Sequence, residues 1–366
     1  MRYVDMHLYP RELPEWLHVE VATAVSATSG GKVRPAAVSP RQRPSALDPI
    51  FRGGALVDVL LDACAVPRSY GAPSCQVDVR VGDWSWSALA LGQRTARCAG
   101  GRFTMSAPAP ITAPVRISFG TAYGGGESGE PCAPRPSMKE LTSGRAYPRN
   151  PFGRGYRCGT ADGAWELPQL EDETDLLTAE RLERIAAGDW ACAPLPWCLD
   201  EVHAVTFPRC TLLPGLGPDV AGQGEVAETT RGYLRERRTD PEPAVDTRFL
   251  QDAPPWAWLA GLGAGTDIEV RGCLAMGQPL ALAMPGSPAF SATIDGRDVD
   301  LDLRPARLVI RPQHDEIVVH WCGDVVLPRP FLPGVHKRIP ISVRIHGCDS
   351  VPYPTPPVAP RPRFRH

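Results

Sequence analysis

The sequence lacks any continuous apolar run of about 18 residues, the length that a helix needs to cross a bilayer. Its first residues, MRYVDMHLYPRELPEW, also lack the apolar stretch of a signal peptide. Neither sign of charge dominates, since the formal net charge of the 366 residues is −2. No overall field would therefore draw the chain to nucleic acid or to an anionic membrane. We expect a cytoplasmic protein that binds no nucleic acid and does not insert into membranes.

Long helices are also excluded almost everywhere. The chain contains 41 prolines and 35 glycines. Proline removes a backbone donor and breaks helix interiors, and both residue types favour turns. The composition therefore predicts short strands joined by many turns. One short helix is predicted, with Thr178 as its N-cap, Leu182 and Ile185 on one face, and Gly188 just past its end.

No enzyme signature occurs in the sequence. GxSxG, HExxH and the Walker P-loop are absent, and no histidine lies beside an obvious nucleophile. Asp298, Asp300 and Asp302 alternate with apolar residues, which favours a half-buried strand over a calcium loop. We therefore predict a protein that is not an enzyme and carries no cofactor.

Cysteine, in contrast, is abundant, with eleven residues. The odd number, the irregular spacing and the long chain favour reduced, buried thiols over a disulfide scaffold. The sharpest metal candidate is the group Cys192, Cys198, His203 and Cys210. Four soft ligands suit zinc, but no CxxC pair holds two thiolates on one turn. We expect no metal here, and a zinc- or cysteine-dependent hydrolase near Cys192–Cys210 is the alternative hypothesis.

Period-two alternation of apolar and polar residues predicts strands in 76–91, 266–284 and 307–321. Gly82-Asp83 is the predicted turn between the first pair of strands. The sequence VDVR at 77–80, followed by ALA at 88–90, is repeated as IEVR at 268–271 and ALA at 281–283. The fold class is therefore predicted to be mainly β. We expect antiparallel sandwich- or barrel-like lobes with long Gly/Pro-rich loops and one or two short helices. A more specific form of this fold prediction is that the two lobes are related by an internal repeat.

Composition shifts divide the chain into five parts. They are an N-terminal strand with a proline-rich connector (1–54), a first β lobe (55–210), a loop or lobe boundary (211–247), a second β lobe (248–346) and an extended tail (347–366). The boundary segment mixes Gly, Pro, Glu and Arg, and the tail is rich in proline and arginine.

The segment YPRNPFGRGY, from Tyr147 to Tyr156, has a restricted backbone. Its prolines fix φ and push the preceding residues toward extended conformations, while its glycines permit positive φ. Its aromatic side chains would anchor the loop, and its arginines would point outward and bind carboxylates. The alternative is a stiff connector whose arginines pair internally.

Arginine and tryptophan are typical of interface hot spots, and the chain has nine tryptophans. A second contact candidate is the pair Trp256 and Trp258, for which core packing at the start of a strand is the alternative. The candidate partner-binding residues are Arg149, Asn150, Phe152, Arg154, Tyr156, Arg157, Trp256 and Trp258.

Four segments follow one another along the chain. They are PVRISFGTAYGG at 114–125, NPFGRGY at 150–156, LPQLE at 167–171 and RFLQDAPP at 248–255. Their order resembles the 2169 family of domains of unknown function, which is found beside type VI secretion effectors and PAAR-repeat spike tips. One departure is Gly92-Gln-Arg94, where the family usually has Gly-Asp-Arg and a tryptophan.

The resemblance implies a non-catalytic adaptor or chaperone. Such a protein would bind a protein effector or toxin associated with a PAAR tip and help to load it onto the secretion spike. Its expected partners are therefore the effector and the PAAR-repeat spike tip or the spike trimer.

Overall fold

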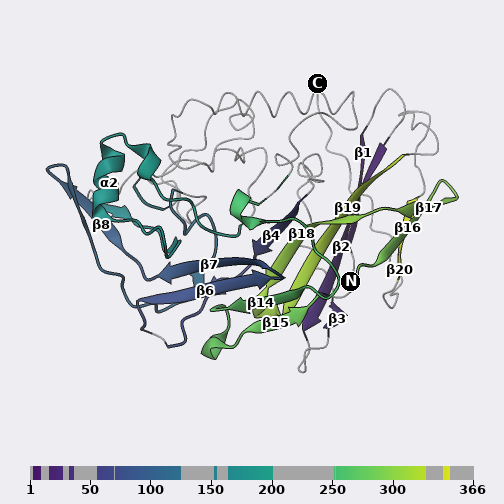
Figure 1. Cartoon of the computed structure of the whole chain (residues 1–366), viewed down its shortest axis with the longest axis horizontal. Helices are drawn as coiled ribbons and strands as arrows, with labels where there is room; N and C mark the ends of the chain where they lie inside the picture. The colour runs from purple at the N-terminus through teal and green to yellow at the C-terminus, as the bar shows by residue number, and fades with distance from the viewer. Residues whose placement is uncertain are drawn as a thin grey trace, which may run out of the picture.

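The computed structural model describes residues 3–9, 16–27, 33–36, 56–69, 71–124, 152–154, 164–200, 251, 253–284, 286–326 and 341–346. The predicted mainly β class is confirmed, because strands dominate this part of the chain and one α-helix accompanies them. Figure 1 shows three-stranded sheets at opposite ends of the molecule, with two larger sheets between them.

The strands of the described residues form five sheets, and the largest has seven strands in the order β1-β2-β19-β18-β4-β13, with β3 also paired to β2. These strands are β1 (Tyr3–Tyr9), β2 (Trp16–Ala27), β3 (Val33–Ala36), β4 (Val57–Leu61), β13 (Trp258–Leu259), β18 (Arg304–Arg311) and β19 (Glu316–Val326). The pair β4–β18 is parallel, and the other pairs of this sheet are antiparallel.

The second sheet has five strands in the order β12-β7-β6-β14-β15. These strands are β6 (Ser74–Val81), β7 (Trp84–Leu91), β12 (Leu170–Glu171), β14 (Asp267–Arg271) and β15 (Leu280–Ala283). All four pairs are antiparallel.

The smaller sheets complete the β structure. One three-stranded sheet contains β8 (Thr95–Ala99), β9 (Arg102–Met105) and β11 (Ala164–Glu166). The other contains β16 (Ala289–Ile294), β17 (Arg297–Leu301) and β20 (Ile341–His346). The two-stranded sheet pairs β5 (Cys64–Ala65) with β10 (Val115–Arg116). The helical elements include the α-helix α2 (Ala179–Ala186) and the 3-10 helices η3 (Trp190–Cys192), η6 (Pro255–Ala257), η7 (Ala275–Gly277) and η8 (Pro312–His314).

The five-stranded sheet follows the predicted alternation. Val77, Val79 and Val81 are buried on one face, while charged residues of β6 lie on the other. Gly82 and Asp83 form the predicted turn between β6 and β7, and Gly82 has φ +57°. A positive φ of this kind is readily adopted by glycine.

The sequence echo VDVR/IEVR has a direct structural meaning, because β6 and β14 pair with each other. Val79 lies opposite Val270, with Asp78 opposite Arg271 and Arg80 opposite Glu269. The two strands are thus related by a local two-fold axis. The repeated ALA sequence does not occupy equivalent positions in β7 and β15, since Ala88 is buried whereas Ala281 is exposed.

The two predicted lobes contribute strands to the same sheets. β14 from the second lobe pairs with β6 from the first, and β18 pairs with β4. The predicted lobe boundary at 211–247 itself falls outside the described residues and stays a prediction.

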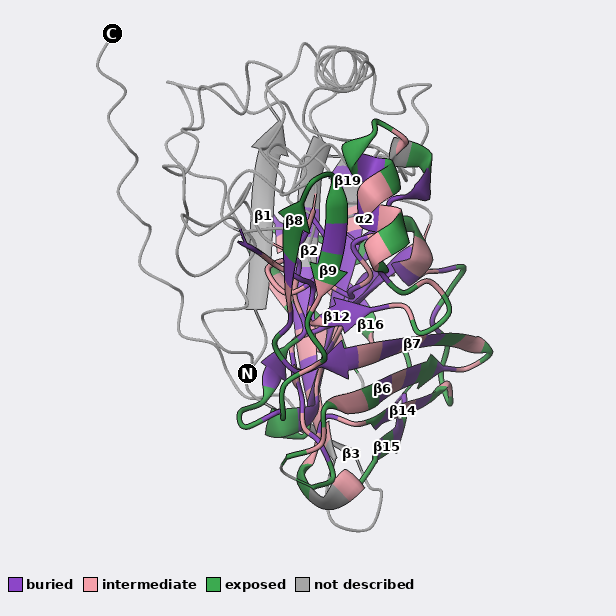
Figure 2. Cartoon of the chain, turned by 90° about the vertical axis from the view of Figure 1, so that its left-hand side faces the viewer, coloured by how far each residue is buried: buried purple, intermediate pink, exposed green. Residues whose placement is uncertain are grey.

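Two main hydrophobic clusters form the core. The larger one joins the seven-stranded and five-stranded sheets, and the smaller one lies under α2. Figure 2 shows the buried residues concentrated along the strands that face one another. The predicted helix is confirmed: the Thr178 hydroxyl accepts from the Arg181 N–H at 3.2 Å, Leu182 and Ile185 are buried, and Gly188 has φ +92°.

Asp298 and Asp300 follow the strand prediction, since both are exposed on β17, where Leu301 is buried. Asp302 is also exposed, but it lies one residue past the end of that strand. In the part of the chain that the structure describes, no helix is long and apolar enough to cross a membrane.

Candidate functional site: the junction of the signature segments

Three of the four signature segments meet at one place, which we call the signature junction (Arg94, Thr121–Gly124, Phe152–Arg154 and Glu166–Glu171). The Thr121 carbonyl accepts from the N–H groups of Gln169 and Leu170 at 2.8 and 3.2 Å. The Gly124 N–H donates to the Gly153 carbonyl at 2.5 Å. Segments far apart in sequence are therefore fixed to each other through their backbones.

Arg154 is the central side chain of the NPFGRGY segment. Its Nε and Nη2 donate to Oε2 of Glu166 at 3.1 and 3.0 Å, and its Nη1 donates to Oε1 of Gln169. Its backbone N–H also donates to the Glu166 carbonyl at 3.0 Å. The Arg154 and Glu166 side chains are 18% and 22% exposed. Arg154 therefore follows the alternative in which the arginine pairs internally.

Phe152 anchors the same segment to the smaller core cluster. Its ring centroid lies 5.1 Å from that of Trp165 and 5.6 Å from that of Phe103. Phe103 and Trp165 are themselves 5.5 Å apart, so the three rings form one cluster. Aromatic groups at these separations contribute attraction beyond their buried area. The predicted anchoring by an aromatic residue is confirmed for Phe152.

Arg94 and Glu171 form a buried ion pair within the signature junction. Nη2 of Arg94 donates to Oε1 of Glu171 and, at 2.8 Å, to the Pro168 carbonyl. The other carboxylate oxygen of Glu171 accepts from the Leu177 N–H at 3.1 Å. The two side chains are only 8% and 2% exposed. Burial raises the pKa of Glu171, and the charge and hydrogen bond of Arg94 oppose that shift.

The backbone two residues before Arg94 packs so closely against Ala109 that only glycine fits at position 92. A Cβ at Gly92 would lie 1.7 Å from the Ala109 carbonyl oxygen, which no side chain permits. Gln93 is exposed, whereas Arg94 is buried. The departure of this sequence from the Gly-Asp-Arg pattern therefore affects a surface position and leaves the buried arginine in place.

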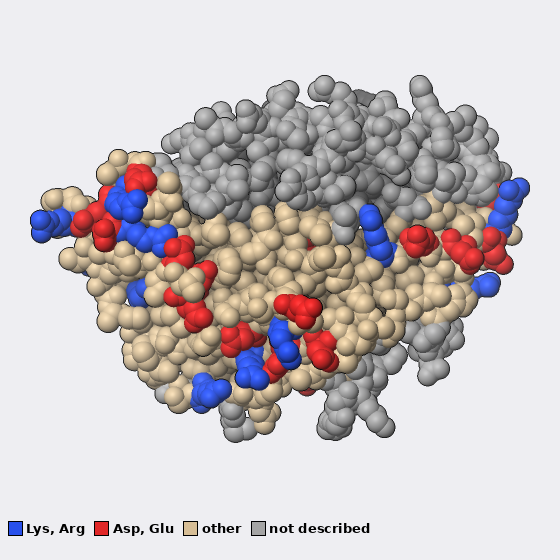
Figure 3. All heavy atoms as spheres, in the orientation of Figure 1, with Lys and Arg blue, Asp and Glu red and all other residues tan. Residues whose placement is uncertain are grey.

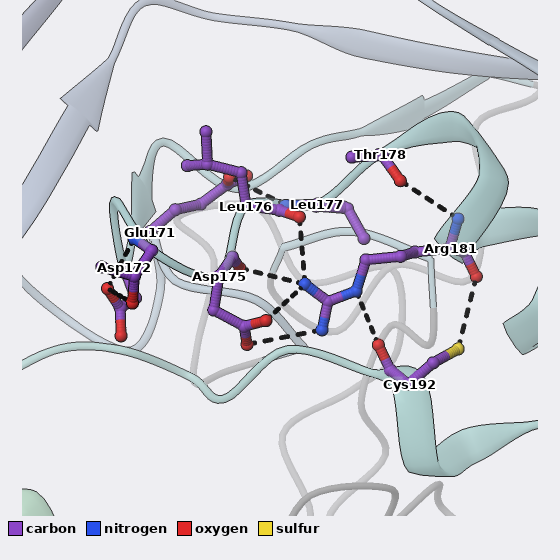
Figure 4. Close-up of polar contacts among 9 residues, drawn as sticks. Glu171, Asp172, Asp175, Leu176, Leu177, Thr178, Arg181 and Cys192 are labelled. Atoms are coloured by element: carbon purple, nitrogen blue, oxygen red, sulfur yellow. Dashed lines mark hydrogen bonds and ion pairs between the residues drawn. The ribbon is translucent and has the colours of Figure 1, made fainter.

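Figure 4 shows how α2 fixes the acidic segment that follows Glu171. Arg181 donates to both carboxylate oxygens of Asp175 at 2.7 and 3.3 Å and to the Leu176 carbonyl at 3.0 Å. Its Nε donates to the Cys192 carbonyl at 2.7 Å. One guanidinium thus ties the segment before the helix to the turn after it.

The zinc candidates are divided between different surroundings. The Cys192 thiol donates to the Asp189 carbonyl at 2.9 Å and belongs to the smaller core cluster. Cys198 is fully buried in the larger cluster, and burial raises its pKa well above the ordinary value. His203 and Cys210 lie outside the described residues. Among the described residues, no group of three or more His, Cys, Asp or Glu side chains is placed to hold a metal ion.

The tryptophan candidates pack against the larger core cluster. The ring of Trp256 stacks on that of Trp197 at 5.3 Å, and Trp197 lies 6.4 Å from Trp86. Trp256 Nε1 donates to the Cys198 carbonyl at 2.8 Å, and Trp258 Nε1 donates to the Ala253 carbonyl at 2.9 Å. Both tryptophans are partly buried, in agreement with the core-packing alternative.

The remaining candidates Arg149, Asn150, Tyr156 and Arg157 lie outside the described residues, and their contact role stays a prediction. The residues that carry the junction but were not predicted as a site are Arg94, Glu166, Gln169 and Glu171. Their signal was present, since Arg94 ends the GQR segment and the LPQLE segment contains Gln169 and Glu171. Ion pairing between these segments is not visible from the sequence.

Comparison with known proteins finds one family. The model of the family DUF2169, described as uncharacterized proteins conserved in bacteria, matches residues 43–322, which is most of the chain. No curated protein and no solved structure matches. The matched range includes every segment of the signature junction.

Proposed function

We propose that this chain, which belongs to the DUF2169 family, is a non-catalytic adaptor that binds a type VI secretion effector and helps to load it onto the spike. The observation that supports this most is the internal use of the signature residues. Arg94 pairs with Glu171, and Arg154 pairs with Glu166. Polar groups that carry out chemistry must reach a substrate, whereas these groups hold segments of the chain together.

A rigid base for loops suits a binding protein. The junction joins Gly124 to Gly153 by a hydrogen bond, so the described residues that flank the segment 125–151 are held together. Loops held by a rigid scaffold commonly carry binding function, and a fixed base reduces the entropy lost when a partner binds. In this proposal Arg149 and Arg157, on either side of the anchored Phe152–Arg154, contact the partner.

The first experiment is co-expression with a PAAR-tip toxin encoded next to this protein. We expect a stable complex on size-exclusion chromatography and a higher yield of soluble toxin. A correctly folded protein that neither binds the toxin nor raises its solubility would contradict the proposal.

Charge-reversal variants distinguish an arginine that contacts the partner from one that holds segments of the fold together. Arg149→Glu should weaken the complex without a change in melting temperature, because the proposal places this side chain at the interface. Arg154→Glu serves as the matched comparison. It should lower the melting temperature, because a third hydrogen-bond acceptor would then lie beside the acceptor oxygens of Glu166 and Gln169, with no donor between them. Equal affinity of wild type and Arg149→Glu would remove Arg149 from the interface.

A further inference from the structure

The local two-fold axis between β6 and β14 makes the two ends of the five-stranded sheet comparable. β7 pairs with β6 as β15 pairs with β14, so that Trp86 of β7 corresponds to Leu280 of β15 and Leu89 corresponds to Ala283. Both hairpins turn their apolar residues to the same core, since Trp86, Ala88, Leu280 and Leu282 are buried. The two halves differ in what lies next to them.

On one side, the outer edge of β7 is occupied. β12 pairs with it, with Leu170 opposite Ala90 and Glu171 opposite Leu89. The Leu91 N–H donates to the Gln169 carbonyl at 2.7 Å. The odd-numbered residues of β7 thus direct their backbone groups toward the added strand.

On the other side, β15 has no neighbouring strand beyond β14 within the described residues. Figures 1 and 2 both place β15 at the outer end of its sheet. The Met284 N–H donates to the Thr266 carbonyl at 2.9 Å, and the Gly265 N–H donates to the Met284 carbonyl at 2.9 Å. The even-numbered residues of β15 therefore bond to β14, and the N–H and C=O groups of Ala281 and Ala283 point away from it.

This edge offers only a short stretch for pairing. Natural edge strands are commonly protected by charged side chains, proline or bulges. β15 reads Leu-Ala-Leu-Ala and contains no charge, but Pro279 and Pro285 flank it in the sequence, so its outward-facing N–H groups are those of Ala281 and Ala283. The side chains of Ala281 and Ala283 are exposed and small, so they leave room beside the strand. β12 forms only two residue pairs with β7, so a short edge is sufficient for strand addition in this sheet.

The geometry points to β15 as a docking edge for an extended strand of a partner protein, which would occupy the position that β12 occupies beside β7. The recognised segment is amphipathic, with apolar side chains on the face of Leu280 and Leu282 and polar side chains on the face of Ala281 and Ala283. Backbone hydrogen bonds to Ala281 and Ala283 hold it, as in strand addition to other sheet edges. The identification of this partner as a secretion effector rests on the function proposed above.

The test uses the full chain and a displayed library of random twelve-residue peptides. We expect enrichment of peptides with apolar residues at alternate positions. Ala283→Pro removes one outward N–H without touching the bonds to β14, and proline is tolerated at such edges. It should weaken the binding of an enriched peptide by about tenfold or more, since a lost bond leaves a carbonyl unpaired.

Ala283→Val is the matched control, because it adds a β-branched side chain at the same position and keeps the N–H. It should bind within about twofold of wild type. Ala281→Pro provides a second removal of an outward N–H, in case Ala283→Pro lowers the melting temperature. Absence of enriched peptides, or equal binding by both proline variants and wild type, would overturn the inference. So would a wild-type dimer in sedimentation that Ala283→Pro converts to monomer, because a second copy would then occupy the edge.

The effector complex separates this inference from the proposed function. If the toxin complex forms and Ala283→Pro leaves its affinity unchanged, the edge is not the effector site, although the adaptor function stands. If wild type binds strand peptides through this edge but forms no toxin complex, the adaptor function fails and the docking edge stands with another partner.

Discussion

Ion pairs of the same chemistry occupy two contrasting regions of this molecule. At the signature junction, Arg94 and Glu171 are almost completely buried. Across β6 and β14, Arg80 and Glu269 lie 3.2 Å apart on the outer face of the sheet and are 56% and 21% exposed. Figure 3 shows acidic and basic residues gathered in a band low on this face, where β6 and β14 lie in Figure 1.

The difference between the regions teaches which charges matter to the fold. An exposed pair gains little, because water and salt screen it. A buried pair carries a large desolvation cost, and removal of one partner leaves a buried charge without compensation. We therefore expect the loss of the buried pair in the signature junction to be the most damaging, and the loss of the exposed pair of Arg80 and Glu269 to matter less.

The largest expected effect follows from breaking the buried pair. Glu171→Ala leaves the Arg94 charge buried and removes the acceptor of the Leu177 N–H. We expect the free energy of unfolding in urea to fall by about 3–5 kcal/mol. The double change Arg94→Met with Glu171→Leu should recover much of this loss, because no charge then remains buried. An effect of Glu171→Ala below about 1 kcal/mol would contradict the contrast between the regions.

An intermediate effect is expected at Arg154, whose pair is partly buried. Arg154→Ala removes three side-chain hydrogen bonds to Glu166 and Gln169, all of them partly buried, so that solvent can replace them in part. The expected loss is about 1–2 kcal/mol in urea denaturation. Arg154→Lys keeps the charge but not the forked geometry, and should recover only part of it. Full recovery by lysine would show that charge alone holds the segment.

A small effect is expected at the exposed ion pairs that Glu269 forms with Arg80 and Arg271. Glu269→Ala removes the acceptor of Arg80 and Arg271. It is the matched control for Glu171→Ala, with an expected change within about 1 kcal/mol that shrinks further in 1 M salt. A cost equal to that of Glu171→Ala would remove the distinction drawn between the buried and the exposed pairs.

The smallest effect is a pH dependence at Asp62, which forms ion pairs with Arg116 of β10 and Arg311 of β18. Burial alone would raise the pKa of Asp62, but hydrogen bonds and charges from Arg116 and Arg311 outweigh it and lower the pKa below its ordinary value. A lowered folded-state pKa stabilises the fold above the ordinary value of about 4. This stabilisation is lost as the pH falls through the lowered pKa.

Asp62→Asn tests this sign. The melting temperature of the variant should lie below that of wild type at pH 7, and the difference should shrink as the pH falls below about 4. A difference that grows toward acid pH would mean that the pKa of Asp62 is raised in the folded protein. Because Asp62 is partly exposed, added salt should reduce the difference at pH 7.

Local features of the fold could be read from the sequence because short-range chemistry specifies them. The Gly82-Asp83 turn, the Thr178 cap and the alternation of β6 are each fixed by a few neighbouring residues. Contacts between distant segments could not be read in this way. Arg94 and Glu171 are 77 residues apart, and Arg80 and Glu269 are 189 residues apart.

For the candidate site, the sequence indicated the segments but not the roles of their residues. Phe152 anchors its segment as predicted, whereas Arg154, Trp256 and Trp258 are engaged within the fold. Whether an arginine faces a partner or a carboxylate of its own chain depends on which segments the fold brings beside it. A single sequence carries no record of that choice.

The sequence by itself determined that this is a mainly β chain, because period-two alternation, proline and glycine act locally, and it also carries the match to the DUF2169 family. Only the tertiary structure decided that the signature segments pair with one another and that the VDVR and IEVR strands lie side by side. Among the described residues, it also leaves the β15 end of that sheet without a strand like β12, which covers the β7 end. The physical reason is that burial and strand pairing are properties of the assembled chain.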